Sequence, residues 1–86
     1  MNINQLIAIV KSKLETKIII QDIKIEDKSF LHKNHKNHKE GRFHLKLSIK
    51  SEELSKLSKI ESTKKIYNIL DIELKEHIHS IQILFD

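Results

Sequence analysis

Residues 43–50, FHLKLSIK, alternate strictly between apolar and polar side chains. This period of two is typical of a β-strand with one buried face, so the apolar residues Phe43, Leu45, Leu47 and Ile49 are expected to point inward. An earlier segment, KIIIQDIKIED, is rich in β-branched residues and alternates from Gln21 onward. It predicts a first strand, antiparallel to the second, with Ile23 and Ile25 inward. The outward lysines of the second strand are expected to meet Asp22 and Glu26 across the ladder.

Between these segments lies a polar stretch, residues 27–45, that is long for a hairpin connection. It contains four of the six histidines and the only glycine. Three of these histidines, His32, His35 and His38, recur at every third residue. The stretch is too charged to pack into a core, and long loops on small domains are often functional. We therefore interpret it as a surface loop whose imidazoles are available for binding.

Helical periodicity appears at the N-terminus and again after the second strand. Asn2 and Gln5 form a capping box, and the apolar spacing that follows predicts an amphipathic helix of about 13 residues. Its stripe consists of Ile3, Leu6, Ile7, Val10 and Leu14. Residues 51–54 indicate a short helical turn. A second helix is predicted to begin at Ser58 with Glu61 in its capping box, although Ser62 is an alternative cap. Its buried stripe consists of Ile66, Ile69, Leu70 and Leu74.

The last segment, residues 78–86 (IHSIQILFD), predicts a third strand with Ile81, Ile83 and Phe85 inward. His79 shares their parity but stands at the start of the strand. Because a helix connects the second and third strands, they are expected to pair in parallel. The chain is thus expected to be one α+β domain of order α-β-β-α-β, a three-stranded mixed sheet with both helices on one face. The other face is open and carries Lys24, His44, Lys46 and Lys50.

The composition narrows the classes of function. The sequence has 86 residues, no cysteine and a formal charge of +4. Any metal site must therefore use His, Asp or Glu, or borrow ligands from a partner. The positive charge suits acidic partners or phosphates, although a solvated lysine-rich surface explains it as well. We expect a cytoplasmic protein without a membrane span and, because no catalytic set of residues stands out, no enzymatic activity.

Four short motifs, in order, resemble the BolA-like protein family. Residues 27–32 (DKSFLH) resemble the family's loop, Asp-Glu-Ser-(Tyr/His)-x-His. The segment that runs from residues 44–45 (HL) to residues 50–51 (KS) resembles its second strand, which opens His-Phe and closes Val-Ser. Residues 66–74 (IYNILDIEL) resemble Ile-Tyr…Leu-x-x-Glu-Leu, and residues 78–81 (IHSI) resemble Val-His-Ala-Leu.

The resemblance implies that residues 1–86 form a single BolA-like domain, similar to the class II KH fold. It also implies a partner, a monothiol glutaredoxin, with which the chain shares a [2Fe-2S] cluster in iron–sulfur trafficking or iron and redox regulation. Glutaredoxin and glutathione then supply thiolates, and this chain supplies two imidazoles. By position these are His32 and His79, with His35 or His38 as substitutes for His32. Alone, the chain is expected to hold no cofactor and to be a monomer or a weak homodimer.

Other interpretations of the histidines stay open. Without the family motif, a strand-edge histidine bonded to backbone is the favoured interpretation of His79. His44 is expected to be a solvated strand residue, with a position facing the partner as the alternative. His77 is expected at the C-terminal end of the second helix, where a cation is favoured by the helix dipole. The loop histidines alone could bind Zn²⁺, Ni²⁺ or Cu²⁺, although the lysines between them oppose a cation.

Binding of DNA is a further alternative, since some family members are reported to regulate transcription and respond to stress. Lys56, Lys59, Lys64 and Lys65 are the candidate phosphate contacts, sufficient for weak and salt-sensitive binding. Against it, the Gly-x-x-Gly clamp of KH domains is absent from the sequence. The Arg-His pair of the family falls on residues 62–63, Ser-Thr.

Overall fold

The structure, a computed structural model, describes residues 1–29 and 42–86. Its elements follow in the order α1 (Ile3–Lys17), β1 (Asp22–Asp27), β2 (Phe43–Lys50), α2 (Glu52–Ser55), α3 (Lys59–Ile69), α4 (Asp71–Glu76) and β3 (Ile78–Phe85). The predicted order α-β-β-α-β is confirmed, with the short turn at residues 51–54 present as α2. The predicted second helix is divided into α3 and α4.

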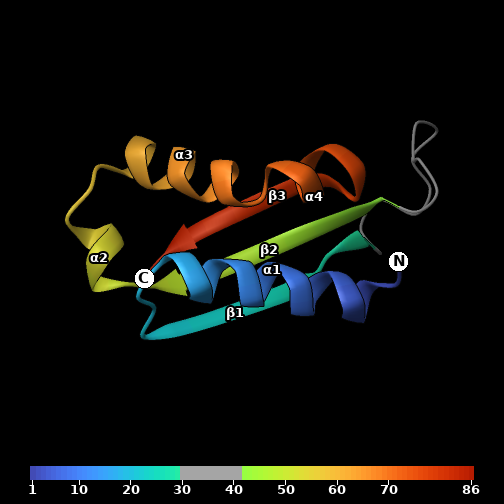
Figure 1. Cartoon of the computed structure of the whole chain (residues 1–86), viewed down its shortest axis with the longest axis horizontal. Helices are drawn as coiled ribbons and strands as arrows, with labels where there is room; N and C mark the ends of the chain where they lie inside the picture. The colour runs from blue at the N-terminus through green and yellow to red at the C-terminus, as the bar shows by residue number, and fades with distance from the viewer. Residues whose placement is uncertain (30–41) are drawn as a thin grey trace.

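The three strands form one mixed sheet in the order β1-β2-β3 (Figure 1). β1 and β2 are antiparallel, with Ile25 opposite Leu47, and β2 and β3 are parallel, with Leu47 opposite Ile83. Both pairings are as predicted. A helical connection between β2 and β3 is what allows the parallel pair, because a tight turn would force the strands to run in opposite directions.

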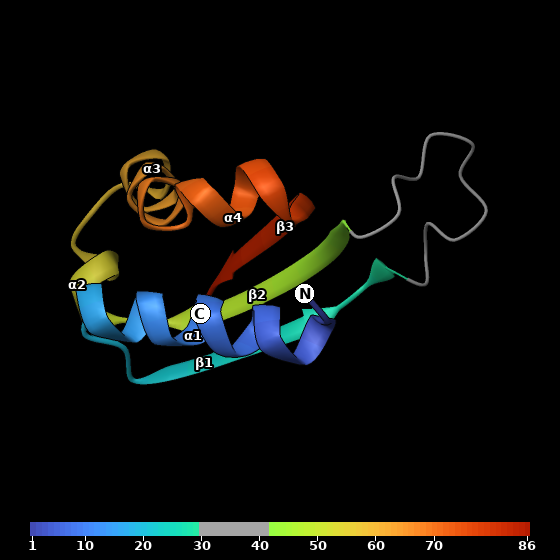
Figure 2. The same ribbon diagram turned by 45° about the vertical axis from the view of Figure 1, so that its right-hand side comes forward.

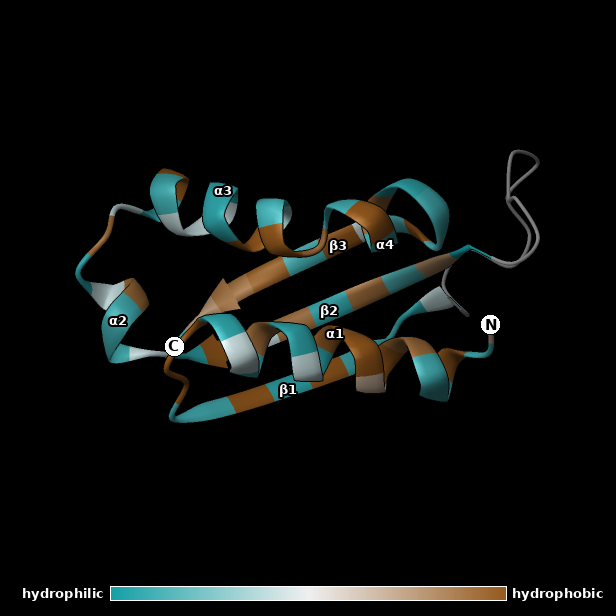
Figure 3. Cartoon of the chain, viewed as in Figure 1, coloured by the Kyte–Doolittle hydropathy of each residue, from teal (hydrophilic) through white to brown (hydrophobic). Residues whose placement is uncertain are grey.

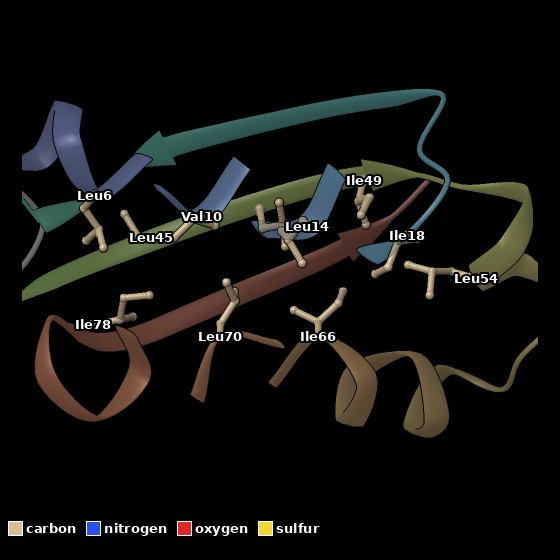
Figure 4. Packing of buried hydrophobic residues seen from close by; sticks show 11 residues of the cluster. Leu6, Val10, Leu14, Ile18, Leu45, Ile49, Leu54, Ile66, Leu70 and Ile78 are labelled. Atoms are coloured by element: carbon tan, nitrogen blue, oxygen red, sulfur yellow. The ribbon is translucent and has the colours of Figure 1, made fainter. Parts of the chain in front are cut away.

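The helices cover one face of this sheet. Buried side chains from α1, β2 and α3 meet there: Leu6, Val10, Leu14, Leu45, Leu47, Ile49, Ile66 and Leu70 (Figure 4). The alternation of β2 and the apolar stripe of α1 are visible as changes of colour along each element in Figure 3. The predicted inward residues therefore form the core, and burying each large aliphatic side chain contributes roughly 1.5–3 kcal/mol to folding.

Side-chain caps fix where the helices begin. At α1, Asn2 Oδ1 accepts from the Gln5 N–H at 2.8 Å and Gln5 Oε1 accepts from the Asn2 N–H at 3.0 Å, which confirms the capping box. At α3, Ser58 Oγ accepts from the Glu61 N–H at 3.1 Å. The alternative cap, Ser62, is buried instead and donates to the Leu54 carbonyl at 3.1 Å. Ser58 is thus the cap of the second helix.

The division between α3 and α4 was not predicted. Leu70 has φ −97° and ψ 18°, outside the helical region, yet its N–H still donates to the Ile66 carbonyl at 3.0 Å. Leu70 is fully buried at this point. No glycine or proline marks the break in the sequence, so local propensity gives no signal for it.

The open face of the sheet carries the expected charges, but their pairing differs from the prediction. The register places Lys46 opposite Glu26. Glu26 instead forms ion pairs with Lys24 at 3.0 Å and Lys28 at 3.5 Å. The hydrogen bond from Lys24, together with the two positive charges, lowers the pKa of Glu26. Two lysines that flank a glutamate on its own chain segment can reach it more easily than the lysine across the ladder.

Candidate functional site

The candidate site lies at the end of the sheet where β1 ends and β2 and β3 begin (Figure 1). Backbone hydrogen bonds hold both described ends of the predicted loop there. The Lys28 N–H donates to the His44 carbonyl at 2.7 Å, and the Phe43 N–H donates to the His77 carbonyl at 2.9 Å. Arg42 Nη2 donates to the Lys75 carbonyl at 3.2 Å. The described ends of the loop are thus held beside the first residues of β3.

The predicted loop ligand His32 and its substitutes His35 and His38 lie outside the described residues. Their assignment to a cluster or to an independent metal site stays a prediction. In residues 1–29 and 42–86, no group of three or more His, Cys, Asp or Glu side chains is placed to hold a metal ion.

His79 is the extra residue of a β-bulge. The register passes from Phe43 opposite Ile78 directly to His44 opposite Ser80, so His79 has no partner on β2. Ile78 is buried, while His79 and Ser80 are both exposed. Strict alternation predicted that His79 lies on the same side of β3 as the inward residues Ile81 and Ile83. This prediction is wrong, because the extra residue of the bulge reverses the alternation at this point of the strand. Bulges often redirect a side chain next to a functional site.

The bulge brings the His79 ring onto the ring of His44. Their centroids are 4.8 Å apart and the ring planes are inclined by 26°, a stacked pair. Nδ1 of His44 lies 2.6 Å from Oγ of Ser80, within hydrogen-bond distance. His44 is only 7% exposed, so the prediction of a solvated His44 was wrong. Parity placed it correctly on the outward face, but the cover that the β3 bulge provides was not visible in the sequence.

A short chain of hydrogen bonds connects this pair with the start of the loop. The Ser29 N–H donates to Asp27 Oδ1 at 2.9 Å, and the His44 N–H donates to Ser29 Oγ at 3.0 Å. Asp27 and Ser29 are the residues of the DKS motif that matched the family's loop. Side-chain bonds of this kind fix a turn as the chain leaves a strand. The described start of the loop and the stacked histidines are therefore parts of one hydrogen-bonded unit.

The third described histidine, His77, is the C-cap of α4, as predicted. Its Nε2 lies 3.8 Å from Oε2 of Glu76. Its side chain is 27% exposed, and its carbonyl binds the start of β2. His77 is thus close to His79 in sequence but outside the stacked pair, which makes it a useful reference residue for experiments.

Of the lysines predicted to contact DNA, Lys56 and Lys59 lie between α2 and the start of α3, at the opposite end of the sheet (Figure 2). Lys64 and Lys65 lie in the middle of α3. Lys56, Lys59 and Lys64 are exposed. Lys65 instead forms an ion pair with Glu53 at 2.8 Å. The hydrogen bond from Lys65, followed by that from the Ile19 N–H, lowers the pKa of Glu53. DNA binding stays a prediction, and Lys65 would have to leave Glu53 to contribute to it.

The sequence model of the BolA-like protein family matches residues 14–85, which is most of the chain. This chain belongs to the BolA-like family. The match spans His44, the predicted ligand His79 and the described start of the loop. A comparison with curated proteins gives no match.

Solved BolA structures share the fold of this BolA-like chain. The BolA domain of SufE1 from Arabidopsis thaliana has a TM-score of 0.79 and 24% identity, over 100% of this chain and 93% of that one. BolA1 from Arabidopsis thaliana has a TM-score of 0.76 and 20% identity, over 91% of this chain and 86% of that one. BolA1 from Mus musculus has a TM-score of 0.72 and 18% identity, over 90% of this chain and 60% of that one. These similarities confirm the architecture.

The described helices include none that is long and apolar enough to cross a lipid bilayer.

Proposed function

We propose that this BolA-like chain is a non-enzymatic adaptor that binds a monothiol glutaredoxin and shares a [2Fe-2S] cluster with it. In this proposal His79 and the loop residue His32 are the ligands from this chain, and glutaredoxin and glutathione supply thiolates. The adaptor then acts in iron–sulfur trafficking or in iron and redox regulation. The observation that carries the proposal is His79 itself, an exposed imidazole held at the end of the sheet beside the described ends of the loop.

The donor set of the chain suits such a shared site. The sequence has no cysteine, so it offers imidazole rather than thiolate. The described residues provide no complete set of metal ligands, so a cluster held here requires ligands from outside them. Iron–sulfur clusters accept two histidines in place of two cysteines, which raises the reduction potential relative to ligation by thiolates alone.

The residues behind His79 have a positioning role in this proposal. Its ring is stacked on His44, whose own ring is held by Ser80 Oγ at 2.6 Å. Such support reduces the rotamer freedom that an exposed imidazole would lose on binding, and partners of this kind commonly orient metal ligands. The bulge fixes the backbone of His79 in the same place. A preorganised imidazole thus faces outward, where a partner protein can approach it.

Mixing the chain with a cluster-loaded monothiol glutaredoxin tests the proposal. We expect a stable heterodimer with visible absorption and circular dichroism that differ from those of glutaredoxin alone. His79→Ala should return the spectrum to that of the glutaredoxin, whereas His77→Ala, a matched change two residues away, should leave the heterodimer spectrum intact. A His79→Ala heterodimer with the unaltered spectrum would show that His79 is not a ligand.

A further inference from the structure

The two outer edges of the sheet differ sharply in charge. β1 carries four charged residues among six, and Lys24 and Glu26 pair along it. β3, residues 78–85 (IHSIQILF), has no Lys, Arg, Asp or Glu. Charged side chains are a common protection of edge strands against pairing with another chain. The β1 edge therefore has this protection and the β3 edge does not.

The backbone of β3 has unused hydrogen-bonding groups on this edge. The Asp86 N–H donates to the Ile49 carbonyl at 2.9 Å, so beyond the bulge at His79 the even-numbered residues of β3 bond to β2. Because donors and acceptors alternate in direction along a strand, those of Ile81, Ile83 and Phe85 point to the outer edge. In the part of the chain that the structure describes, no further strand follows β3 in the sheet. This edge can thus accept an additional strand.

Apolar side chains flank the same edge. Ile81, Ile83 and Phe85 are only partly buried against the core, and Leu84 is 38% exposed. A cleft of about 550 Å³ opens where the end of β3 meets the start of α3 and includes Ile83 and Phe85 in its lining. The arrowhead of β3 is coloured toward the hydrophobic end of the scale in Figure 3. An added strand would therefore bury apolar surface as well as backbone groups.

Helix α3 extends this surface. Ile69 faces α1, since it lines a hollow together with residues of α1. Tyr67 lies about 200° around the helix from Ile69, and Ile60 is seven residues before Tyr67 on the same stripe. Ile60 is 69% exposed and Tyr67 43% exposed. Figures 1 and 2 both show α3 and α4 along the β3 side of the sheet, with α1 along the β1 side.

We propose that this edge is the interface of a homodimer in which β3 pairs antiparallel with β3 of a second copy. With Gln82 opposite Gln82 of the second copy, Ile81 pairs with Ile83 and Ser80 with Leu84, in both directions. This register makes about four backbone hydrogen bonds and brings no two charges together. The result is a continuous six-stranded sheet, and Ile60 and Tyr67 of the two α3 helices lie on the same side of it.

A second copy fits this edge better than a flexible peptide for two reasons. The strand is self-complementary about Gln82, as an isologous two-fold interface requires. It is also already formed, so pairing does not require the ordering of an extended segment, which weakens the binding of disordered partners. The inference uses neither His79 as a ligand nor a glutaredoxin, so it stands independently of the proposed function.

Sedimentation equilibrium of the full chain tests the homodimer, with three substitutions at the two-fold axis. We expect a concentration-dependent dimer for the unaltered chain and for Gln82→Thr. Gln82→Lys and Gln82→Glu should each weaken dimerisation about fivefold, because like charges face each other across the axis. An equimolar mixture of these two variants should form a heterodimer at least as strong as the unaltered dimer.

Three results would overturn the homodimer. The chain could stay monomeric up to its solubility limit. It could form a dimer of unchanged strength in all three variants, which would place the interface elsewhere. Amides of Ile81, Ile83 and Phe85 could also become protected from hydrogen exchange only when a glutaredoxin is added, which would assign the edge to that partner. Far-ultraviolet circular dichroism of each variant confirms that it is folded.

Discussion

Removal of the His44 side chain should have two effects. It should lower the free energy of unfolding of the chain, and it should remove the ring on which His79 is stacked. His44 is 7% exposed, stacks on His79 at 4.8 Å and is hydrogen-bonded to Ser80. A stacked aromatic pair contributes roughly 0.5–1.5 kcal/mol and a hydrogen bond roughly 0.5–1.5 kcal/mol. Both partners, His79 and Ser80, are exposed and regain water, which limits the loss. We therefore expect His44→Ala to reduce the free energy of unfolding by about 2 kcal/mol.

Urea denaturation measures this loss, and nuclear magnetic resonance of the folded chain measures the effect on His79. His44→Phe keeps the ring contact but not Nδ1, so it should lose only about 1 kcal/mol, the hydrogen-bond part. His77→Ala serves as the control and should change stability by less than about 0.5 kcal/mol. The ring protons of His79 should shift in His44→Ala and much less in His77→Ala. A His44→Ala chain of unaltered stability and unaltered His79 signals would refute the stacked arrangement.

Three further predictions concern the frame that holds the site. Glu73 is buried, with Oε2 2.7 Å from Lys13 Nζ and Oε1 without a partner among the described residues. Lys13→Met leaves this buried carboxylate unpaired. It should therefore lower the free energy of unfolding, measured by urea denaturation, by about 2 kcal/mol after allowance for the partial exposure of Lys13. A smaller loss of stability in Lys13→Met than in Glu73→Gln would contradict this prediction. Ser58→Ala should cost about 1 kcal/mol through loss of the α3 cap, and a change near zero in denaturation would speak against the cap. Because the pKa of Glu53 is lowered in the folded chain, this carboxylate stabilises the fold at pH values above its ordinary pKa of 4.5. This contribution is lost as the pH falls through the pKa of Glu53 in the folded chain. In Lys65→Ala, a titration followed by nuclear magnetic resonance should show the pKa of Glu53 moving back up, and an unmoved pKa would exclude the ion pair as its cause.

The alternation of β1 and β2 and the helical spacing of α1 were sufficient to predict the sheet, its pairing and most of the core. These patterns are repeated along each element, so a single exception does not obscure them. The capping boxes at Asn2 and Ser58 were equally readable, because each depends on residues three positions apart. The break at Leu70 was not predicted, since no glycine or proline marks it in the sequence.

The candidate site was predicted only in part, for a physical reason. His79 was predicted as a ligand from the resemblance, and this stays a prediction, but its neighbour His44 was expected to be solvated. One extra residue in β3 changes which side chains face outward and places the two rings together. A bulge of this kind has no glycine here and depends on a partner strand far away in sequence. The roles of Ser80 and Ser29 follow from the same long-range pairing.

Pulsed electron paramagnetic resonance of the reduced cluster in the heterodimer tests most directly whether His79 is a ligand. With ¹⁵N-labelled histidine in this chain alone, we predict hyperfine couplings from nitrogen bound to iron. His79→Ala should remove one coupling, while His77→Ala should retain all of them. A reduced cluster without nitrogen coupling from this chain, or with couplings that persist in His79→Ala, would contradict the proposal that His79 binds the shared cluster.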